Sequence, residues 1–281
     1  MMFNIQTSLF LVYLPLIIAD YNETLKDILS NTYLNTLQII KKYNYPLERH
    51  WVTTEDGYIV ELQRIPYSIN KNTVQNRPAI LFFHGNTGSA REFIVTGRKS
   101  MGLVLSDEGY DIWLANARGT SWSRRHRYLN PNYKQFWMFS FHEFGVYDLT
   151  AEINYIVNVT KQDKIFFIGH SQGGTAFCVM GSERPEMNEK IRLAILVAPN
   201  VYNTHQKNSF LRTLVDNIGL LKDIVYSIGL YEIPFNLQLG KFFSQLCVSR
   251  LKFLCSIYIN TVMGFDKDQM DHELFTWEFF F

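Results

Sequence analysis

The most useful absences in this sequence concern charge and cofactor motifs. Lys and Arg together number 27 and Asp and Glu 26, so the net charge is only +1. Nucleic-acid-binding proteins usually carry a clear excess of positive charge, and this balance therefore argues against that class. The chain also contains no His-Glu-x-x-His zinc motif and no Walker-type phosphate loop. We therefore expect no nucleic-acid partner, no metal ion and no cofactor.

Long apolar runs are scarce as well. The run at residues 9–19 is interrupted by Pro15 and is too short for a bilayer-spanning helix, which needs about 20 residues. Its length, and Ala19 at its end, predict a secretory signal peptide over residues 1–19. No Lys or Arg precedes the run, and a buried helix is the alternative. Two glycosylation sequons, at Asn22 and Asn158, agree with secretion.

Cysteine is rare: the chain has Cys178, Cys247 and Cys255, and an odd count leaves one of them free. We expect Cys178 to be a buried thiol on a helix. Cys247 and Cys255 could form a disulfide in a secreted protein. On one straight helix these two would lie ~12 Å apart, whereas a disulfide tolerates at most ~7 Å between Cα atoms. A bridge therefore requires a break in the helix between them.

What the sequence does contain is an alternation of apolar strands and helical segments. We expect strands at residues 79–83, 110–115, 165–168 and 193–197, separated by helical segments at 91–108, 141–160 and 173–181. This order predicts an α/β protein whose mostly parallel sheet is covered by helices on both faces. An Asp-Gly turn between two β-rich segments predicts a hairpin over residues 51–66. Because no strand pattern follows Asn200, we expect a core at residues 20–200 and a helical cap at 201–281.

The chemistry is carried by Gly169-His170-Ser171-Gln172-Gly173, which lies between a predicted strand and a predicted helix. A Gly-x-Ser-x-Gly pattern in this context predicts a nucleophile elbow, a sharp turn that exposes the serine hydroxyl. We therefore predict Ser171 as a catalytic nucleophile. The alternative is a serine that only caps the helix in a structural turn.

An acyl-transfer nucleophile needs hydrogen-bond donors for the oxyanion that forms during attack. We predict that the backbone N–H of Gln172, next to the serine, is one of them. The other is expected from the loop after the earlier strand, where the N–H of Asn86 fits best. The alternative for His84-Gly85 is a tight strand exit without a catalytic role. His84 precedes the serine, so we expect it to pack and form hydrogen bonds rather than act as the base.

Several motifs in combination resemble the acid lipases, the family of gastric lipase and lysosomal acid lipase. They are Thr54-Glu55-Asp56-Gly57-Tyr58, His84-Gly85, residues 109–114, Asn116-Ala117-Arg118-Gly119, residues 136–141, Tyr147-Asp148-Leu149 and the elbow itself. The resemblance covers residues 43–266. It implies an α/β-hydrolase fold with a helical cap that meets a lipid interface, hydrolysis of lipid esters of the triglyceride or steryl ester class, and a secreted or lysosomal location.

The same resemblance maps the nucleophile to Ser171 and the oxyanion donors to Asn86 and Gln172. Cys247 and Cys255 match the family's paired cap cysteines, one residue closer together here. Asn86-Thr87-Gly88 departs from the pattern, because relatives carry apolar residues after His-Gly. Only backbone N–H groups are needed there, so the departure leaves the predicted oxyanion donors in place.

The largest departure concerns the catalytic acid and base. The family supplies an Asp and then a His from loops after later core strands, whereas only His205 and His272 follow Ser171 here, both in the predicted cap. We therefore expect a chain truncated before these residues, which would be poorly active by itself. The alternatives are a catalytically inactive lipid-binding remnant and an incomplete gene model.

Overall fold

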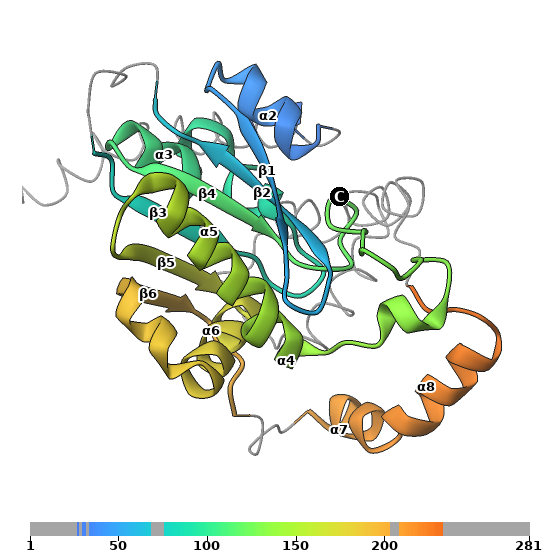
Figure 1. Cartoon of the computed structure of the whole chain (residues 1–281). Coiled ribbons are helices and arrows are strands. Elements are labelled where there is room, and N and C mark those ends of the chain that lie inside the picture. The colour runs from blue at the N-terminus through green and yellow to red at the C-terminus, as the bar shows by residue number, and fades with distance from the viewer. Residues whose placement is uncertain (1–26, 28–29, 32–33, 69–75, 203–207, 233–281) are drawn as a thin grey trace, which may run out of the picture.

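A mixed six-stranded sheet forms the centre of the molecule (Figure 1). The computed structural model describes residues 27, 30–31, 34–68, 76–202 and 208–232. The strands are β1 (Glu48–Thr53), β2 (Ile59–Ile65), β3 (Ala79–Phe83), β4 (Asp111–Asn116), β5 (Ile165–His170) and β6 (Ile191–Val197). They lie side by side in the order β1-β2-β4-β3-β5-β6. The strands predicted at 79–83, 110–115, 165–168 and 193–197 are present, with bounds that differ by two residues or fewer.

The sheet is parallel over the four strands β4, β3, β5 and β6 and antiparallel at its start. Strands β4, β3, β5 and β6 pair in parallel, while β1 pairs with β2 and β2 with β4 in antiparallel fashion. The predicted hairpin accounts for β1 and β2, and its turn closes with a 2.8 Å hydrogen bond from Thr54 N–H to the Tyr58 carbonyl. The carboxyl ends of the parallel strands meet at one edge of the sheet, which is where sites form in this kind of fold.

Two apolar clusters lie on opposite faces of the sheet, and successive side chains of β3 point alternately into one cluster and the other. Leu81 and Phe83 belong to the first cluster, whereas Ile80 and Phe82 belong to the second, and all four are buried. The first cluster is covered by η5 (Phe144–Leu149), α5 (Thr150–Thr160) and α6 (Gln172–Glu183). The second is covered by α2 (Thr36–Lys42), η2 (Ala90–Phe93) and α3 (Met101–Asp107). Helices on both faces confirm the α/β-hydrolase class expected from the sequence.

Coverage is incomplete at β6, the last strand of the sheet order. Leu193 and Ile195 alternate along this strand and remain 52% and 47% exposed, although their type and spacing are those of core residues. Ala194 and Leu196, which point to the other face, pack on the first apolar cluster. The expectation that helices cover both faces is therefore wrong for β6 within the part of the chain that the structure describes.

Two predicted helical segments are less regular than the sequence suggested. The segment predicted at 91–108 divides into η2, η3 (Gly97–Lys99) and α3. Gly97 adopts φ +68°, which a right-handed helix does not allow and which favours glycine, so one continuous helix cannot form. The segment predicted at 141–160 is continuous, as α4 (Phe141–Glu143), η5 and α5, but η5 has π-helical geometry. Gly145 in η5 packs so closely on α6 that a Cβ there would lie 2.6 Å from the Ala176 carbonyl oxygen.

The described chain ends in two helices that stand apart from the sheet, α7 (Ser209–Asp216) and α8 (Ile218–Ser227) (Figure 1). They agree with the helical segment expected after Asn200, and α8 ends just before Gly229, which adopts φ +75°. The remaining short helices are η4 (Lys134–Trp137) and η6 (Pro185–Lys190). No helix in the described ranges is long and apolar enough to cross a membrane.

Several sequence predictions fall outside the described residues. These are the signal peptide at 1–19, the sequon at Asn22, the disulfide between Cys247 and Cys255, the histidines His205 and His272, and most of the cap predicted at 201–281. The division into a core and a cap at residue 200 also stays a prediction. Cys178 lies on α6 and is a free thiol, but it is only half-buried rather than buried.

Candidate active site

Ser171 occupies a strained turn between β5 and α6. Its backbone has φ +47° and ψ −111°, outside the regions that residues other than glycine usually adopt. Such a conformation persists only where the surroundings hold it. Here the N–H of Ser171 donates to the Val197 carbonyl at the end of β6 at 2.9 Å. The flanking glycines are required by space, because a Cβ on Gly173 would collide with the carbonyl oxygen of Phe83. The local geometry is that of a tight strand–turn–helix elbow.

The first turn of α6 starts immediately after the serine. The carbonyl of Ser171 accepts from the N–H groups of Gly174 and Thr175, at 3.0 and 3.2 Å. Gln172 is the first residue of the helix, so its N–H has no intrahelical acceptor. The positive end of the helix dipole lies at the same place. A negatively charged oxygen near Ser171 would therefore meet favourable backbone charge.

The loop after β3 is fixed by His84. The imidazole Nε2 accepts from the Ala117 N–H at 3.1 Å, and Nδ1 lies 2.7 Å from the Gly85 carbonyl oxygen. Since a backbone N–H can only donate and a carbonyl can only accept, the ring is neutral, with its proton on Nδ1. Burial lowers the pKa of His84, which agrees with a neutral ring. His84 is thus a buried hydrogen-bonding residue, as expected from the sequence, and its ring is not free to act as a base.

The direction of the Asn86 N–H follows from the same contacts. The Gly85 carbonyl accepts from His84 Nδ1 and, at 3.2 Å, from the Gly88 N–H. No cis peptide bond occurs in the described residues, so the Asn86 N–H points away from the Gly85 carbonyl of the same peptide unit. Within the described part of the chain this N–H has no hydrogen-bond partner. As far as the described residues go, it is open to a ligand.

Contacts of Gly85 bring this loop onto the elbow. A Cβ built on Gly85 would lie 3.3 Å from the Cβ of Ser171 and 3.1 Å from Nδ1 of His170. The structure therefore places the residue before Asn86 directly against Ser171, with Gln172 next in the chain. The roles of Ser171, Asn86 and Gln172 in catalysis stay predictions.

Sequence reasoning missed Glu92, a residue of η2 that lies between the loop and the elbow. Its Oε2 accepts from the Gly85 N–H at 3.0 Å, and its Oε1 lies 2.5 Å from Nδ1 of His170. Its side chain is only 14% exposed. No motif marks this glutamate in the sequence, because it becomes a neighbour of His170 only when β3 and β5 pair.

The described residues give Ser171 no base. Its hydroxyl forms no hydrogen bond with any residue in the described ranges. Asp216 and Asp223 are exposed on α7 and α8. No group of three or more His, Cys, Asp or Glu side chains in this part of the chain could hold a metal ion.

An ion cluster joins the turn after β1, the loop after β4 and η5. The guanidinium of Arg118 contacts Asp148 at 2.7 Å and Asp56 at 2.5 Å, and its Cζ lies 4.0 Å from the ring centre of Tyr58. Burial alone would lower the pKa of Arg118, but the charges of Asp148 and Asp56 raise it above its usual value. Asp56, Arg118 and Asp148 all come from the motifs named above, and the fold brings them into one cluster with a structural role.

Glu152 on α5 contrasts with this paired cluster. Its side chain is fully buried, and neither carboxylate oxygen has a hydrogen-bond partner in the part of the chain that the structure describes. Burial, and then the nearby charge of Asp148, raise its pKa well above the usual value. Glu152 is therefore protonated and neutral over a range in which an exposed glutamate is charged.

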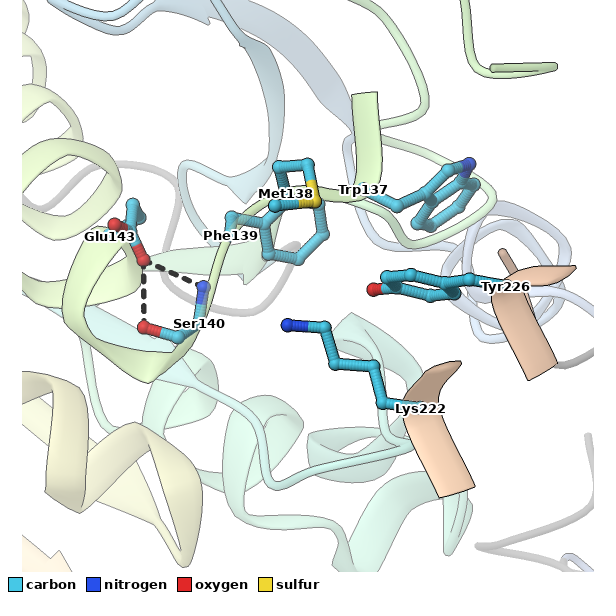
Figure 2. Close-up of a pocket in the computed structure, with 7 residues that line it drawn as sticks. All are labelled: Trp137, Met138, Phe139, Ser140, Glu143, Lys222 and Tyr226. Carbon is cyan, nitrogen blue, oxygen red and sulfur yellow. Dashed lines mark hydrogen bonds between the residues drawn. The ribbon is translucent and has the colours of Figure 1, made fainter. Parts of the chain in front are cut away.

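One pocket of about 200 Å³ lies between α8 and the segment from η4 to α4. Figure 2 shows Lys222 and Tyr226 of α8 facing Trp137, Met138 and Phe139, with Glu143 bonded to Ser140 at the pocket edge. The glutamate accepts from the Ser140 backbone N–H at 2.6 Å and from its hydroxyl at 2.9 Å. Ser171 does not line this pocket.

Asn158, the second predicted glycosylation site, is exposed on α5.

Comparison with known proteins decides the family. Residues 78–222 match the family model described as alpha/beta hydrolase fold, and residues 36–97 match the partial alpha/beta-hydrolase lipase region. This chain belongs to the alpha/beta hydrolase family. Its elbow, with Ser171 between β5 and α6, is the place where that family carries its nucleophile.

Similar curated proteins are lipases. Lipase 3 of Drosophila melanogaster is 37% identical over 84% of this chain and 61% of its own length. Gastric triacylglycerol lipase of Mus musculus is 36% identical over 85% of this chain and 60% of its own length. These matches confirm the resemblance to the acid lipases.

Among solved structures, naproxen esterase of Bacillus subtilis matches with a TM-score of 0.45 and 12% identity, over 89% of this chain and 65% of that one. The chain thus spans about three fifths of the length of the curated relatives it matches.

Proposed function

We propose that this protein takes part in the hydrolysis of carboxylic esters of lipids, with Ser171 as the nucleophile. The Oγ of Ser171 attacks the ester carbonyl carbon, and the N–H groups of Asn86 and Gln172 bind the oxyanion. The ester C–O bond then breaks, the serine proton passes to the leaving alcohol, and water cleaves the acyl-serine to release the fatty acid. The observation that carries this proposal is the strained elbow of Ser171 pressed against the loop that precedes Asn86.

The energetic demand on the two N–H groups is considerable. One such donor is worth about 2.7–4 kcal/mol of transition-state stabilisation. Gln172 meets this demand because it begins a helix, and Asn86 because its N–H has no partner within the described residues. A base for the serine proton is also needed, and the family pattern would place it after the later strands of the sheet.

A lipid surface as the partner is supported by the last described helices. The apolar side chains exposed on α7 and α8 include Val215, Ile218, Leu220, Leu221 and Ile224. A concentration of exposed apolar side chains marks an interaction surface more often than an accident. We propose that this face meets the lipid. Leu220→Asp on α8 should weaken sedimentation with triolein emulsions several-fold, while Ser227→Asp on the same helix should have little effect.

The location proposed with this function is secreted or lysosomal. It is supported by the apolar run at residues 9–19, by the sequons at Asn22 and Asn158, and by the exposure of Asn158. Mass spectrometry of the protein from a secreting eukaryotic host should find residues 1–19 removed and glycan on Asn158. An intact N-terminus with unmodified Asn158 would contradict the secretory route.

A second function remains open because the Ser171 hydroxyl has no base among the described residues. In this alternative, the protein binds lipid without hydrolysing it. Emulsion binding that is equal in the wild-type chain and in Ser171→Ala, with no ester turnover in either, would favour it.

A fluorophosphonate probe tests the main proposal directly, because it labels an activated serine. We expect labelling of the wild-type chain and hydrolysis of p-nitrophenyl butyrate, with both lost in Ser171→Ala. Ser182→Ala, an exposed serine near the end of α6, is the matched control and should behave like the wild type. Labelling that survives in Ser171→Ala would show that Ser171 is not the nucleophile, and unlabelled wild-type protein would favour lipid binding without hydrolysis.

A further inference from the structure

Glu92 has a geometry that a solvent-facing glutamate would not need. It belongs to the short helix η2, and its side chain is largely buried. Its two carboxylate oxygens contact two different segments: Oε2 accepts from Gly85 in the loop after β3, and Oε1 meets His170 at the end of β5. A single side chain therefore spans the two segments that carry the predicted oxyanion donors.

On the loop side, Glu92 fixes the peptide unit that precedes the predicted donor. The Gly85 N–H is held at 3.0 Å by Oε2, while the Gly85 carbonyl is held by His84 and Gly88. Gly88 is tightly packed on the same carboxylate, since a Cβ there would lie 2.7 Å from Oε2. With both neighbouring groups bonded, the Asn86 N–H keeps one direction.

On the elbow side, Glu92 holds the residue next to the nucleophile. Oε1 lies 2.5 Å from His170 Nδ1, which is an ion-pair distance when the ring is protonated, although the contact does not have the angles of a hydrogen bond. His170 is followed directly by Ser171, and its ring also lies against Gly85. Movement of the loop relative to the elbow would therefore break at least one contact of Glu92.

We propose that Glu92 is a positioning residue that keeps the N–H groups of Asn86 and Gln172 in register around the oxyanion. This inference rests on the proposed function of Ser171. A misplacement of ~1 Å in such a site can cost about 100-fold in rate. We assign Glu92 no part in the chemistry itself: it acts through its contacts with Gly85 and His170.

Four variants separate positioning from a general effect on the fold. Glu92→Ala removes both contacts. Glu92→Gln keeps an acceptor for the Gly85 N–H and an amide that can hydrogen-bond His170, so it should rescue most of the function. Glu92→Asp keeps the charge but is too short to reach both segments. Glu189→Ala, on the exposed surface of η6, is the control glutamate.

The first readout is amide hydrogen exchange in peptides covering residues 84–88, which does not depend on catalysis. Glu92→Ala and Glu92→Asp should exchange faster there, with Glu92→Gln and Glu189→Ala close to the wild type and thermal unfolding similar in all. Unchanged exchange in Glu92→Asp would overturn the proposal, whatever the activity. If Glu92→Ala does not fold, the Asp and Gln pair still decides the question.

The second readout is the rate of fluorophosphonate labelling at Ser171, with kcat and KM for p-nitrophenyl butyrate. We expect Glu92→Ala and Glu92→Asp to label about 10- to 100-fold more slowly, with the loss in kcat rather than KM. Equal labelling despite a loosened loop would show that the contacts have no role in the reaction. A wild-type chain that is not labelled would instead refute the proposed function, while hydrogen exchange would still confirm or refute the clamp itself.

Discussion

Strands β5 and β6 are neighbours with similar apolar sequences, yet they lie in different environments. Ile168 of β5 and Ile195 of β6 are partners in register, so their side chains share one face of the sheet. Ile168 is buried in the second apolar cluster, whereas Ile195 is 47% exposed. Burial depends on what covers the strand, and in the described residues the helices on that face reach β5 but not β6. On this face of the sheet, β5 is therefore closely packed next to the elbow, whereas β6 beside it is exposed.

The largest expected difference in stability comes from adding one methyl group at the packed elbow, on α6, and one on α8. In Gly173→Ala the new Cβ would collide with the Phe83 carbonyl, and we expect a loss of about 3 kcal/mol or more in unfolding free energy. Outside its own helix, no described residue lies within 4 Å of a Cβ built on Gly219 in α8, so Gly219→Ala should be neutral or up to ~1 kcal/mol stabilising. Urea denaturation of both variants measures this. Similar changes in the two would mean that α6 does not pack on β3 as described.

Truncating the paired isoleucines measures the difference in packing itself. Ile168→Ala should cost about 2–5 kcal/mol, because it empties a buried site. Ile195→Ala should cost less than ~1 kcal/mol, because its side chain is already half in water. Denaturant midpoints at equal m-values give both numbers. A large cost for Ile195→Ala would show that another part of the protein covers β6.

The buried carboxyl group of Glu152 should make the stability of the fold depend on pH. Because the folded-state pKa of Glu152 is raised, its proton is retained on folding while the unfolded chain loses it above about pH 4.5. Stability should therefore fall as pH rises above this value, by up to ~1.4 kcal/mol per pH unit until the folded-state pKa is reached. Glu152→Gln, which cannot titrate, should remove this component. Thermal unfolding between pH 4 and 8 provides the test, and a profile unaltered by Glu152→Gln would contradict it.

The smallest expected effect concerns backbone strain. Ser171→Gly should stabilise the fold by about 1 kcal/mol, because glycine adopts φ +47° without the cost that other residues incur. It should also abolish fluorophosphonate labelling. Ala198, which follows β6, has the same φ but is exposed, and Ala198→Gly should give a smaller gain with labelling intact. Equal destabilisation of both variants would argue against stored strain at the elbow.

Local pattern was enough to predict the strands and the elbow. Ala79–Phe83 was predicted with the bounds it has, because a short run of apolar residues ending in His-Gly carries its own signals of length and termination. The helix predicted at 91–108 failed at Gly97, where apolar periodicity says nothing about a left-handed φ. A periodic pattern of apolar residues does not predict a helix boundary that depends on a single backbone angle.

The sequence by itself determined the fold class, the family motifs and the position of Ser171 between a strand and a helix, since these depend on residues close together in the chain. Only the tertiary structure decided that Glu92 joins Gly85 to His170 and that, among the described residues, Glu152 is buried without a hydrogen-bond partner and one face of β6 stays exposed. The physical reason is that burial and pairing belong to neighbours far apart in sequence. The residue type of a glutamate does not indicate whether water, a histidine or an apolar core will surround its carboxylate.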